Sequence, residues 1–290
     1  MKILEVKTVQ SGAFRVLIEA LKEILTDVNI DFTMKEEKEL ENGDKEVVGG
    51  ISIIAMNSAN SVLIHLRLDA INFDYYSCLK KKLTIGVNMG NLFKLIKTMN
   101  NTDTLTLFMD DDDMNKLGIR IENAEKNYVS TFKLNLMDID EYEIHIPPTE
   151  FTSVINMPAQ EFHKICRDLN PIADYVEIKS VGKKLIFSIK GDIASNEIVL
   201  GETSNGLTVI NDENNTIIQG IYDLKNLTLF TKCTNLCTNI DMYMKNDYPL
   251  VIRYAVASLG QIHLCLSSIG MSNKLDDSDE WNDDEWENED

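Results

Sequence analysis

Four short segments of this chain share one apolar spacing, and this repeat constrains the fold more than any other feature. In most copies an apolar residue stands at a starting position and again three, four and seven positions later. The starting positions are Phe14, Leu92, Phe162 and Leu227. This spacing places the side chains on one face of an α-helix. The sequence therefore predicts four amphipathic helices, and the fourth stripe is the weakest because it contains Thr231 and Thr234.

Between the predicted helices, apolar and polar residues alternate. The segments 61–68, 104–109 and 239–244 show this pattern, which is typical of half-buried β-strands. The sequence separation from Leu92 to Leu227 is the same as that from Leu105 to Ile240. A helix and the strand after it thus repeat in register. The sequence predicts an α+β fold of two similar domains, each an antiparallel sheet with two helices on one face.

The two halves differ in length. The first two starting positions lie further apart in the sequence than the last two. The highly charged segment 34–49, MKEEKELENGDKEVVG, accounts for this surplus. We interpret it as a loop-like insertion between two strands of the first domain.

The formal net charge is −19, which argues against a protein that attracts nucleic acid with its whole surface. Residues 271–290 contain ten Asp or Glu and one Lys, so this tail contributes −9 and the rest of the chain −10. A DNA-binding surface would have to be a local concentration of Lys and Arg.

The predicted helices offer such a concentration. Five positions after each starting residue stand Glu19, Lys97, Arg167 and Lys232, about 140° around the helix from the start. Five further basic residues flank these positions: Arg15, Lys22, Lys94, Lys164 and Lys225. Basic residues on equivalent outward faces would contact phosphates without reading base sequence. The alternative is that these are ordinary solvated helix faces without a function.

The sequence contains no pattern of residues that predicts catalysis, a metal or a cofactor. The acidic run 110–113 is interpreted as a turn between strands, because four consecutive carboxylates point in different directions. The four histidines are scattered, and no Gly-rich phosphate loop is present. The five cysteines are expected to be reduced thiols, most of them in the core. No apolar run approaches the roughly 18 residues needed to span a membrane.

Five collinear stretches resemble the eukaryotic and viral proliferating cell nuclear antigen family, the trimeric DNA sliding clamps. They are 17–25 (LIEALKEIL), 86–97 (GVNMGNLFKLIK), 134–147 (LNLMDIDEYEIHIP), 157–169 (MPAQEFHKICRDL) and 248–254 (YPLVIRY). The resemblance extends from about Leu4 to Ser268. It implies three chains in a closed ring, with twelve helices around a central hole that holds duplex DNA.

The resemblance also implies roles for individual residues. The inner wall that contacts the DNA backbone would comprise Arg15, Lys22, Lys94, Lys97, Lys164, Arg167, Lys225 and Lys232. A pocket for partner peptides would comprise Met56, Leu63, Ile144, Ile146, Pro147, Pro249 and Leu266. Antiparallel edge strands of neighbouring chains would meet through Val129, Phe132 and Leu134 on one side and Ile193, Ile198 and Leu200 on the other. At one end of the pocket this chain has Cys265, Ser267 and Ser268 where the family often has an aromatic residue and Ala-Pro.

On this basis the chain divides into an N-terminal clamp domain (1–135), a connecting linker (136–148), a C-terminal clamp domain (149–270) and an acidic tail (271–290). The tail contains Trp281 and Trp286 among acidic residues. It is expected to be a disordered solubilising extension. The alternative is a short acidic-aromatic motif that binds a partner or competes with DNA for the basic faces.

The predicted function is that of a non-enzymatic processivity factor. It would encircle double-stranded DNA as a homotrimer and hold DNA polymerase, clamp loader, ligase and nuclease through PIP-box-type peptides, without cofactor or membrane. The expected site of action is the nucleus, or a cytoplasmic replication site if a virus encodes the chain. Two alternatives remain: a subunit of a heterotrimeric checkpoint clamp, and a monomeric viral polymerase processivity factor.

Overall fold

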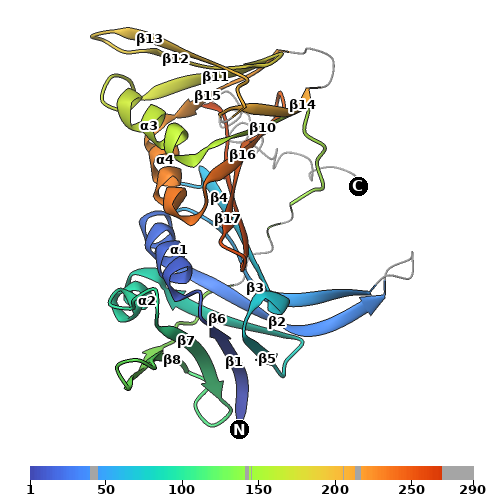
Figure 1. The fold of residues 1–290 in the computed structure, drawn as a ribbon, viewed down its shortest axis with the longest axis vertical. Coiled ribbons are helices and arrows are strands. Elements are labelled where there is room, and N and C mark those ends of the chain that lie inside the picture. The colour runs from blue at the N-terminus through green and yellow to red at the C-terminus, as the bar shows by residue number, and fades with distance from the viewer. Residues whose placement is uncertain (40–44, 141–143, 145, 205, 213–216, 270–290) are drawn as a thin grey trace, which may run out of the picture.

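The computed structural model describes residues 1–39, 45–140, 144, 146–204, 206–212 and 217–269. This part of the chain forms antiparallel sheets, with all the α-helices along one side of the molecule (Figure 1). The helices are α1 (Ser11–Ile24), α2 (Met89–Ile96), α3 (Ala159–Leu169) and α4 (Leu224–Phe230), and a 3-10 helix, η3 (Thr231–Leu236), extends α4.

The first half contains β1 (Lys2–Thr8), β2 (Asp27–Glu39), β3 (Lys45–Met56), β4 (Val62–Asp69), η1 (Ala70–Asn72), β5 (Tyr75–Cys78), β6 (Lys82–Asn88), β7 (Thr104–Asp110), β8 (Lys116–Asn123) and β9 (Tyr128–Asn135). The second half contains β10 (Ser153–Pro158), β11 (Tyr175–Val181), β12 (Lys184–Lys190), β13 (Ser195–Gly201), β14 (Thr208–Asp212), β15 (Ile218–Asp223), β16 (Asn239–Met244), β17 (Leu250–Val256) and β18 (Gly260–Leu266).

The four predicted helices are confirmed. Of the sixteen positions in their apolar stripes, fifteen are buried and Leu95 is half-buried. The weak fourth stripe is buried as well, because its hydroxyls find partners: Thr231 donates to the Thr228 carbonyl at 2.7 Å and Thr234 to the Thr231 carbonyl at 2.5 Å. The repeat extends to the helix caps. Asn88 caps α2 and Asp223 caps α4, and each side chain accepts a hydrogen bond from the backbone N–H three positions later. These two caps have the same sequence separation as Leu92 and Leu227.

The largest sheet joins the two halves of the chain. Its nine strands lie in the order β14-β10-β16-β17-β18-β4-β3-β2-β6, so the last strand of the second half pairs with β4 of the first. A five-stranded sheet (β5-β1-β7-β8-β9) lies at one end of the molecule and a four-stranded sheet (β13-β12-β11-β15) at the other (Figure 1). The two predicted domains therefore share one continuous sheet at their junction.

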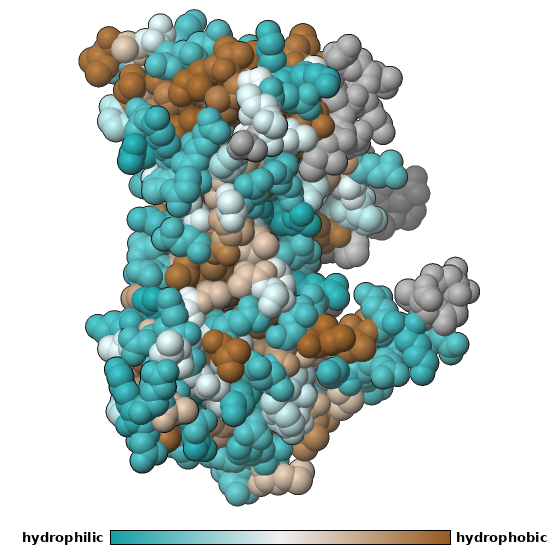
Figure 2. Space-filling model, viewed as in Figure 1, coloured by the Kyte–Doolittle hydropathy of each residue, from teal (hydrophilic) through white to brown (hydrophobic). Residues whose placement is uncertain are grey.

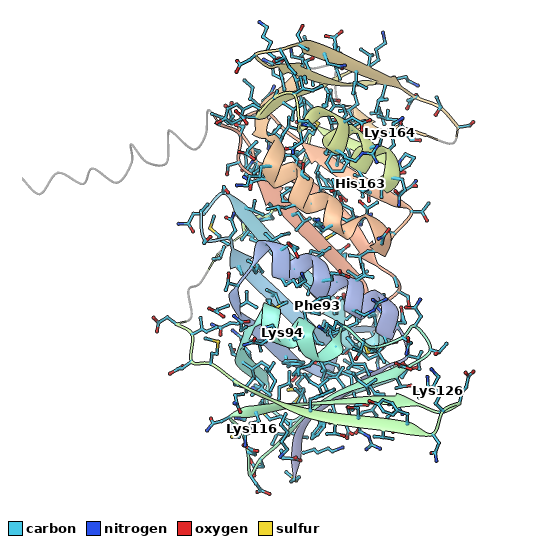
Figure 3. All side chains as sticks on the ribbon, turned by 90° about the vertical axis from the view of Figure 1, so that its left-hand side faces the viewer. Phe93, Lys94, Lys116, Lys126, His163 and Lys164 are labelled. Carbon is cyan, nitrogen blue, oxygen red and sulfur yellow. The ribbon has the colours of Figure 1, made fainter. Side chains whose placement is uncertain are left out.

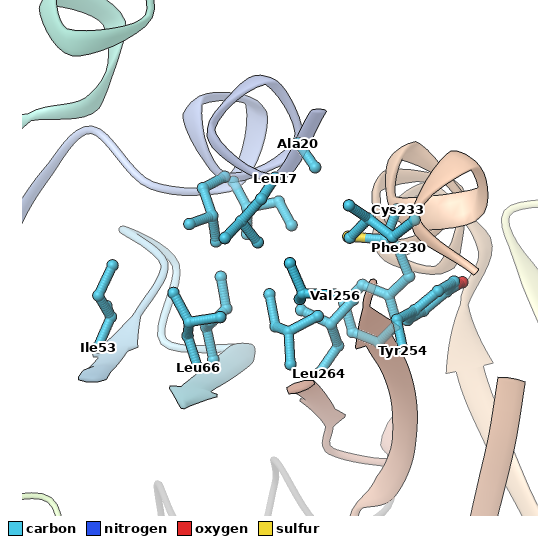
Figure 4. Close-up of a cluster of buried hydrophobic side chains, with 14 of the residues drawn as sticks. Leu17, Ala20, Ile53, Leu66, Phe230, Cys233, Tyr254, Val256 and Leu264 are labelled. Carbon is cyan, nitrogen blue, oxygen red and sulfur yellow. The ribbon is translucent and has the colours of Figure 1, made fainter. Parts of the chain in front are cut away.

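The core crosses this junction. Leu17 and Ala20 of α1, Ile53 of β3 and Leu66 of β4 face a cluster from the second half (Figure 4). The second-half members are Phe230, Cys233, Tyr254, Val256 and Leu264, all of them buried. Because side chains from both halves fill one cluster, neither half encloses this core alone.

The segment 34–49 is not the loop that we predicted. Met34–Glu39 belongs to β2 and Lys45–Gly49 to β3, so this segment extends a hairpin, with residues 40–44 outside the described part. The strands pair out to Glu39 opposite Lys45, with a register shift between Thr33 and Glu36. The prediction was wrong because the charged composition suggested a loop, whereas the two segments pair through their backbones and Glu37 forms an ion pair with Lys45 at 3.5 Å.

Other predictions about the chain can be compared with the structure. The acidic run 110–113 does form the turn between β7 and β8. All five cysteines are free, and Cys78, Cys166 and Cys233 are buried. None of the described helices is long and apolar enough to cross a membrane. Residues 141–143, 145 and 270–290, which hold part of the predicted linker and the predicted tail, lie outside the described residues.

The shared core generates a first prediction. Leu264 is fully buried and pairs with Ile64 across the junction, so Leu264→Ala should lower the free energy of unfolding by about 2–5 kcal/mol. Both halves should unfold in one calorimetric transition before and after the substitution. The control is Gln261→Ala on the same strand, which is only half-buried and should change stability little. Two separate transitions would contradict a common core.

Candidate nucleic-acid and partner interfaces

The helices form a continuous row. Along the long axis of the molecule the order is α3, α4, α1, α2 (Figure 1). Neighbours in this row touch, since α2 contacts α1, α1 contacts α4 and η3, and η3 contacts α3. The predicted apolar stripes point into the core, so the outward faces of all four helices lie on one side of the chain (Figure 3).

All eight predicted DNA-contacting residues lie on or directly after these helices. Arg15 and Lys22 of α1 are half-buried, and the other six are exposed: Lys94, Lys97, Lys164, Arg167, Lys225 and Lys232. Lys94 on α2 and Lys164 on α3 mark the two ends of the row (Figure 3). The structure therefore brings together on one surface residues that lie far apart in the sequence.

Carboxylates neutralise part of this surface. Lys22 forms an ion pair with Glu23, and its ammonium lies 4.7 Å from the centre of the Phe93 ring on α2. The hydrogen bond from Lys22 lowers the pKa of Glu23, and the charge of Lys232 lowers it further. Arg167 pairs with its neighbour Asp168 at 3.0 Å. Within the described chain, no carboxylate forms an ion pair with the remaining exposed basic residues of the row, Lys94, Lys97, Lys164, Lys225 and Lys232. These five are the ones available to an external anion.

A second candidate site is a cavity of about 410 Å³ over the junction of β4 and β18. It lies on the sheet face opposite the buried core. The lining residues are Leu63, His65, Ile146, Pro147, Thr149, Phe151, Tyr248, Pro249, Val251, His263 and Cys265. We call this cavity the junction groove.

Two rows of side chains run across the strands on the sheet face that carries the junction groove. One row is mostly apolar and follows the register Tyr243, Val251, Cys265, Leu63, Met56. The other is mostly polar and follows the register Asp241, Arg253, His263, His65, Ile54. Residues that face each other across neighbouring strands lie on the same face of the sheet, and five residues of these rows line the cavity: Val251, Cys265, Leu63, His263 and His65.

Four of the seven residues predicted for a partner pocket line this groove: Leu63, Ile146, Pro147 and Pro249. Met56 is exposed at the end of the apolar row beside Leu63, and Ile144 is half-buried nearby in sequence, but neither lines the cavity. Leu266 does not line it because successive residues of a strand face opposite sides. Leu266 is only 1% exposed in the core, and Cys265 points into the groove instead.

The sequence reasoning missed several lining residues, above all the two histidines. Their rings stack with centroids 5.9 Å apart. Burial lowers the pKa of His263 to about 4, and the charges of His65 and Arg253 contribute. Burial and the charge of Arg67 also lower the pKa of His65. The alternation Leu63-His65 and His263-Cys265 was visible in the sequence, but the pairing of β4 with β18 was not.

The third candidate surface is a pair of sheet edges. β9 and β13, which contain most of the predicted interface residues, are each an edge strand with one partner in the chain, β8 and β12 respectively. Hydrophobic residues gather where the four-stranded sheet lies at the top of the molecule (Figure 2). On or beside these edges Ile193 is 84% exposed, Val129 53% and Val199 48%, while Leu134 is buried in its own chain. Phe132, Ile198 and Leu200 are half-buried against the core.

Comparison with known proteins gives matches along nearly the whole chain. The family model described as proliferating cell nuclear antigen, N-terminal domain, matches residues 3–144, and the model of the C-terminal domain matches residues 145–269. A probable DNA polymerase sliding clamp of Acanthamoeba polyphaga mimivirus is 33% identical over 297 residues, covering 94% of this chain and 63% of the relative. A probable DNA polymerase sliding clamp 1 of Paramecium bursaria Chlorella virus 1 is 31% identical over 271 residues, covering 92% of this chain and 97% of the relative. The chain thus spans less than two thirds of the first relative and nearly all of the second.

The histidine pair generates a pH prediction. The folded-state pKa of His263 lies below the unfolded value of 6.5, so between those values the unfolded chain binds more protons and stability falls as pH decreases. His263→Gln should reduce the loss of stability between pH 7 and pH 4.5 by on the order of 1–2 kcal/mol, after allowance for solvent screening. The measurement is urea unfolding at both pH values, with His163→Gln on α3 as control. An equal loss in wild type and His263→Gln would contradict the assignment.

Proposed function

The chain belongs to the proliferating cell nuclear antigen family, and on that premise we propose that it is a DNA sliding clamp. In this role it is a non-enzymatic ring subunit that encircles duplex DNA and tethers DNA polymerase where DNA is replicated. The observation that carries the proposal is the continuous sheet across β4 and β18. The row of basic helices lies on one face of this sheet and the apolar groove lies on the other.

Ring closure is supported by the internal repeat. β9 occupies the place in the first half that β18 occupies in the second, and β13 corresponds in the same way to β4. One sequence offset relates both pairs, because Tyr128 and Gly260 are as far apart as Leu66 and Ile198. β4 and β18 pair within the chain, whereas β9 and β13 are unpaired edges of the sheets at opposite ends of the molecule. Head-to-tail pairing of these edges between chains would repeat the internal junction and close a ring.

The repeat also predicts the register between chains. Within the chain, Gln261 stands opposite Arg67. The same offset relates Gln261 to Val129 and Arg67 to Val199, so Val129 of one chain would stand opposite Val199 of the next. Both valines are about half exposed in the single chain, at 53% and 48%. Their mutual burial would cover apolar surface that is otherwise in water.

The remaining elements fit the roles expected of a clamp. The five unpaired basic residues of the helix row would face the hole and contact phosphates of any DNA sequence. The junction groove would receive the aliphatic and aromatic anchors of PIP-box-type peptides from polymerase, clamp loader, ligase or nuclease. Two free edges in one chain favour an assembly over a monomeric processivity factor. Val129 and Val199 of identical chains would bury each other, so the assembly that we propose is a homotrimer, with a heterotrimeric checkpoint clamp as the alternative.

The register predicts a specific cross-link. In a chain with Val129→Cys and Val199→Cys, mild oxidation should join neighbouring subunits into a covalent trimer, because directly opposed residues of paired strands have the Cα separation that a disulfide needs. Denaturing electrophoresis without reductant measures the product. The control combines Val129→Cys with Ile221→Cys on β15, which is the other edge of the four-stranded sheet and 48% exposed. Equal cross-linking in both variants, or a monomer by light scattering, would refute the ring.

The helix row predicts the salt dependence of DNA binding. Replacing Lys97, Arg167 and Lys232 with Glu should weaken binding to duplexes of every sequence and lower the slope of log affinity against log salt by about 0.9 for each phosphate that is no longer neutralised. The control replaces Lys35, Lys38 and Lys45 with Glu, since these residues carry the same charge on the exposed β2–β3 hairpin across the molecule from the helices (Figure 1). Equal effects of the two triple variants would show that net charge, and not the helix row, governs binding.

A further inference from the structure

The junction groove is unusual in this acidic protein because its lining contains no Asp or Glu among the described residues. Two proline rings, the Phe151 and Tyr248 rings and several aliphatic side chains make most of its surface. Phe151 also packs against Tyr243, with ring centroids 5.4 Å apart. At the rim, the ammonium of Lys245 lies 4.7 Å from the centre of the Tyr248 ring. The groove thus suits a flat aromatic side chain flanked by carboxylates.

The C-terminal end of the described chain lies next to this groove. Cys265 of β18 lines it, and the last described residue, Ile269, comes four positions later. Trp281 stands twelve positions beyond Ile269, and Trp286 stands five further on. A segment of that length reaches up to about 40 Å when extended. The length of chain is therefore sufficient to bring either indole back over the groove.

The composition of the tail complements the groove. Its two tryptophans are the only ones in the protein, and the segment 281–286, WNDDEW, places three carboxylates between them. An indole would bury its apolar surface on the proline and aromatic rings, while neighbouring carboxylates would lie near the ammonium of Lys245. The segment therefore combines the two chemical features that the groove accommodates.

We propose that the segment Trp281–Trp286 docks in the junction groove of its own chain and competes there with partner peptides. The inference deepens the proposed function, since it rests on the groove being the partner site. Attachment to the same chain gives the tail an effective concentration in the millimolar range. A weak contact is then enough to occupy the groove until a partner with better anchors displaces it.

The tryptophans themselves report on the docking, because the described body of the protein contains none. In the full chain, Trp emission should be blue-shifted relative to an isolated 270–290 peptide. Ile146→Glu in the groove should shift it back to the emission of the free peptide. The matched control is Ile71→Glu in η1, since Ile146 and Ile71 are 39% and 55% exposed and only Ile146 lines the groove. Circular dichroism establishes that both variants fold.

Two results would overturn the proposal. One is peptide-like emission in the full chain. The other is an emission that shifts when Lys97, Arg167 and Lys232 are replaced with Glu and does not respond to Ile146→Glu, which would place the tail on the helix row instead.

A competition measurement separates this proposal from the proposed function. The probe is a fluorescein-labelled PIP-box-type peptide without Trp (Gln, two spacers, an aliphatic residue, two spacers, two Phe). Deleting residues 274–290, or replacing both tryptophans with Ala, should raise its affinity several-fold to tenfold. Equal affinity for full and truncated chains would refute the docked tail. Failure of the peptide to bind even the truncated chain would refute the groove as a partner site, and Trp emission would still decide whether the tail docks there.

Discussion

The pairing of β4 with β18 is the interaction on which the rest of this structure depends. It joins strands from the two halves of the sequence into one nine-stranded sheet, with Leu264 opposite Ile64. It closes the core against α1 and the helices of the second half. It also aligns the four helices in a row, because each half positions its own two helices against its own strands. Without this pairing the basic faces would not share a surface.

The same strand pair serves two purposes because successive residues of a strand face opposite sides. Leu264 and Leu266 of β18 point into the core, while His263 and Cys265 point into the junction groove. A substitution on one face is therefore expected to act on stability, and one on the other face on binding. The stacked histidines link these effects. Burial lowers the pKa of His263 to about 4 and also lowers the pKa of His65, and both shifts favour the uncharged imidazole in the groove.

The positions of the charged residues matter more for binding in this protein than its net charge does. The formal charge of −19 is unfavourable for DNA, yet five unpaired basic residues lie on one row of helices within the described chain. The phosphates of a duplex in a closed ring would be near this row and far from the acidic hairpin of β2 and β3. The junction groove is a second example. Its described lining contains no carboxylate although the protein is acidic, so an acidic peptide can approach it.

Four helices, the alternating strands, the internal repeat and the basic side of the helices could all be predicted from the residues alone. These properties depend on the short repeat periods of the helix and the strand, which neighbouring residues reveal directly. The sequence could not show that segment 34–49 forms paired strands, because its highly charged composition lacks the apolar alternation that predicts a strand, and the pairing of β2 with β3 is a property of the folded hairpin. Nor could it show that Leu266 belongs to the core, or that His65 stacks on His263 from the other half of the chain. Such contacts depend on the register of strands distant in sequence, and a shift by a single position exchanges the two faces of a strand. The register therefore became known from the folded chain, and with it the set of side chains that form the groove.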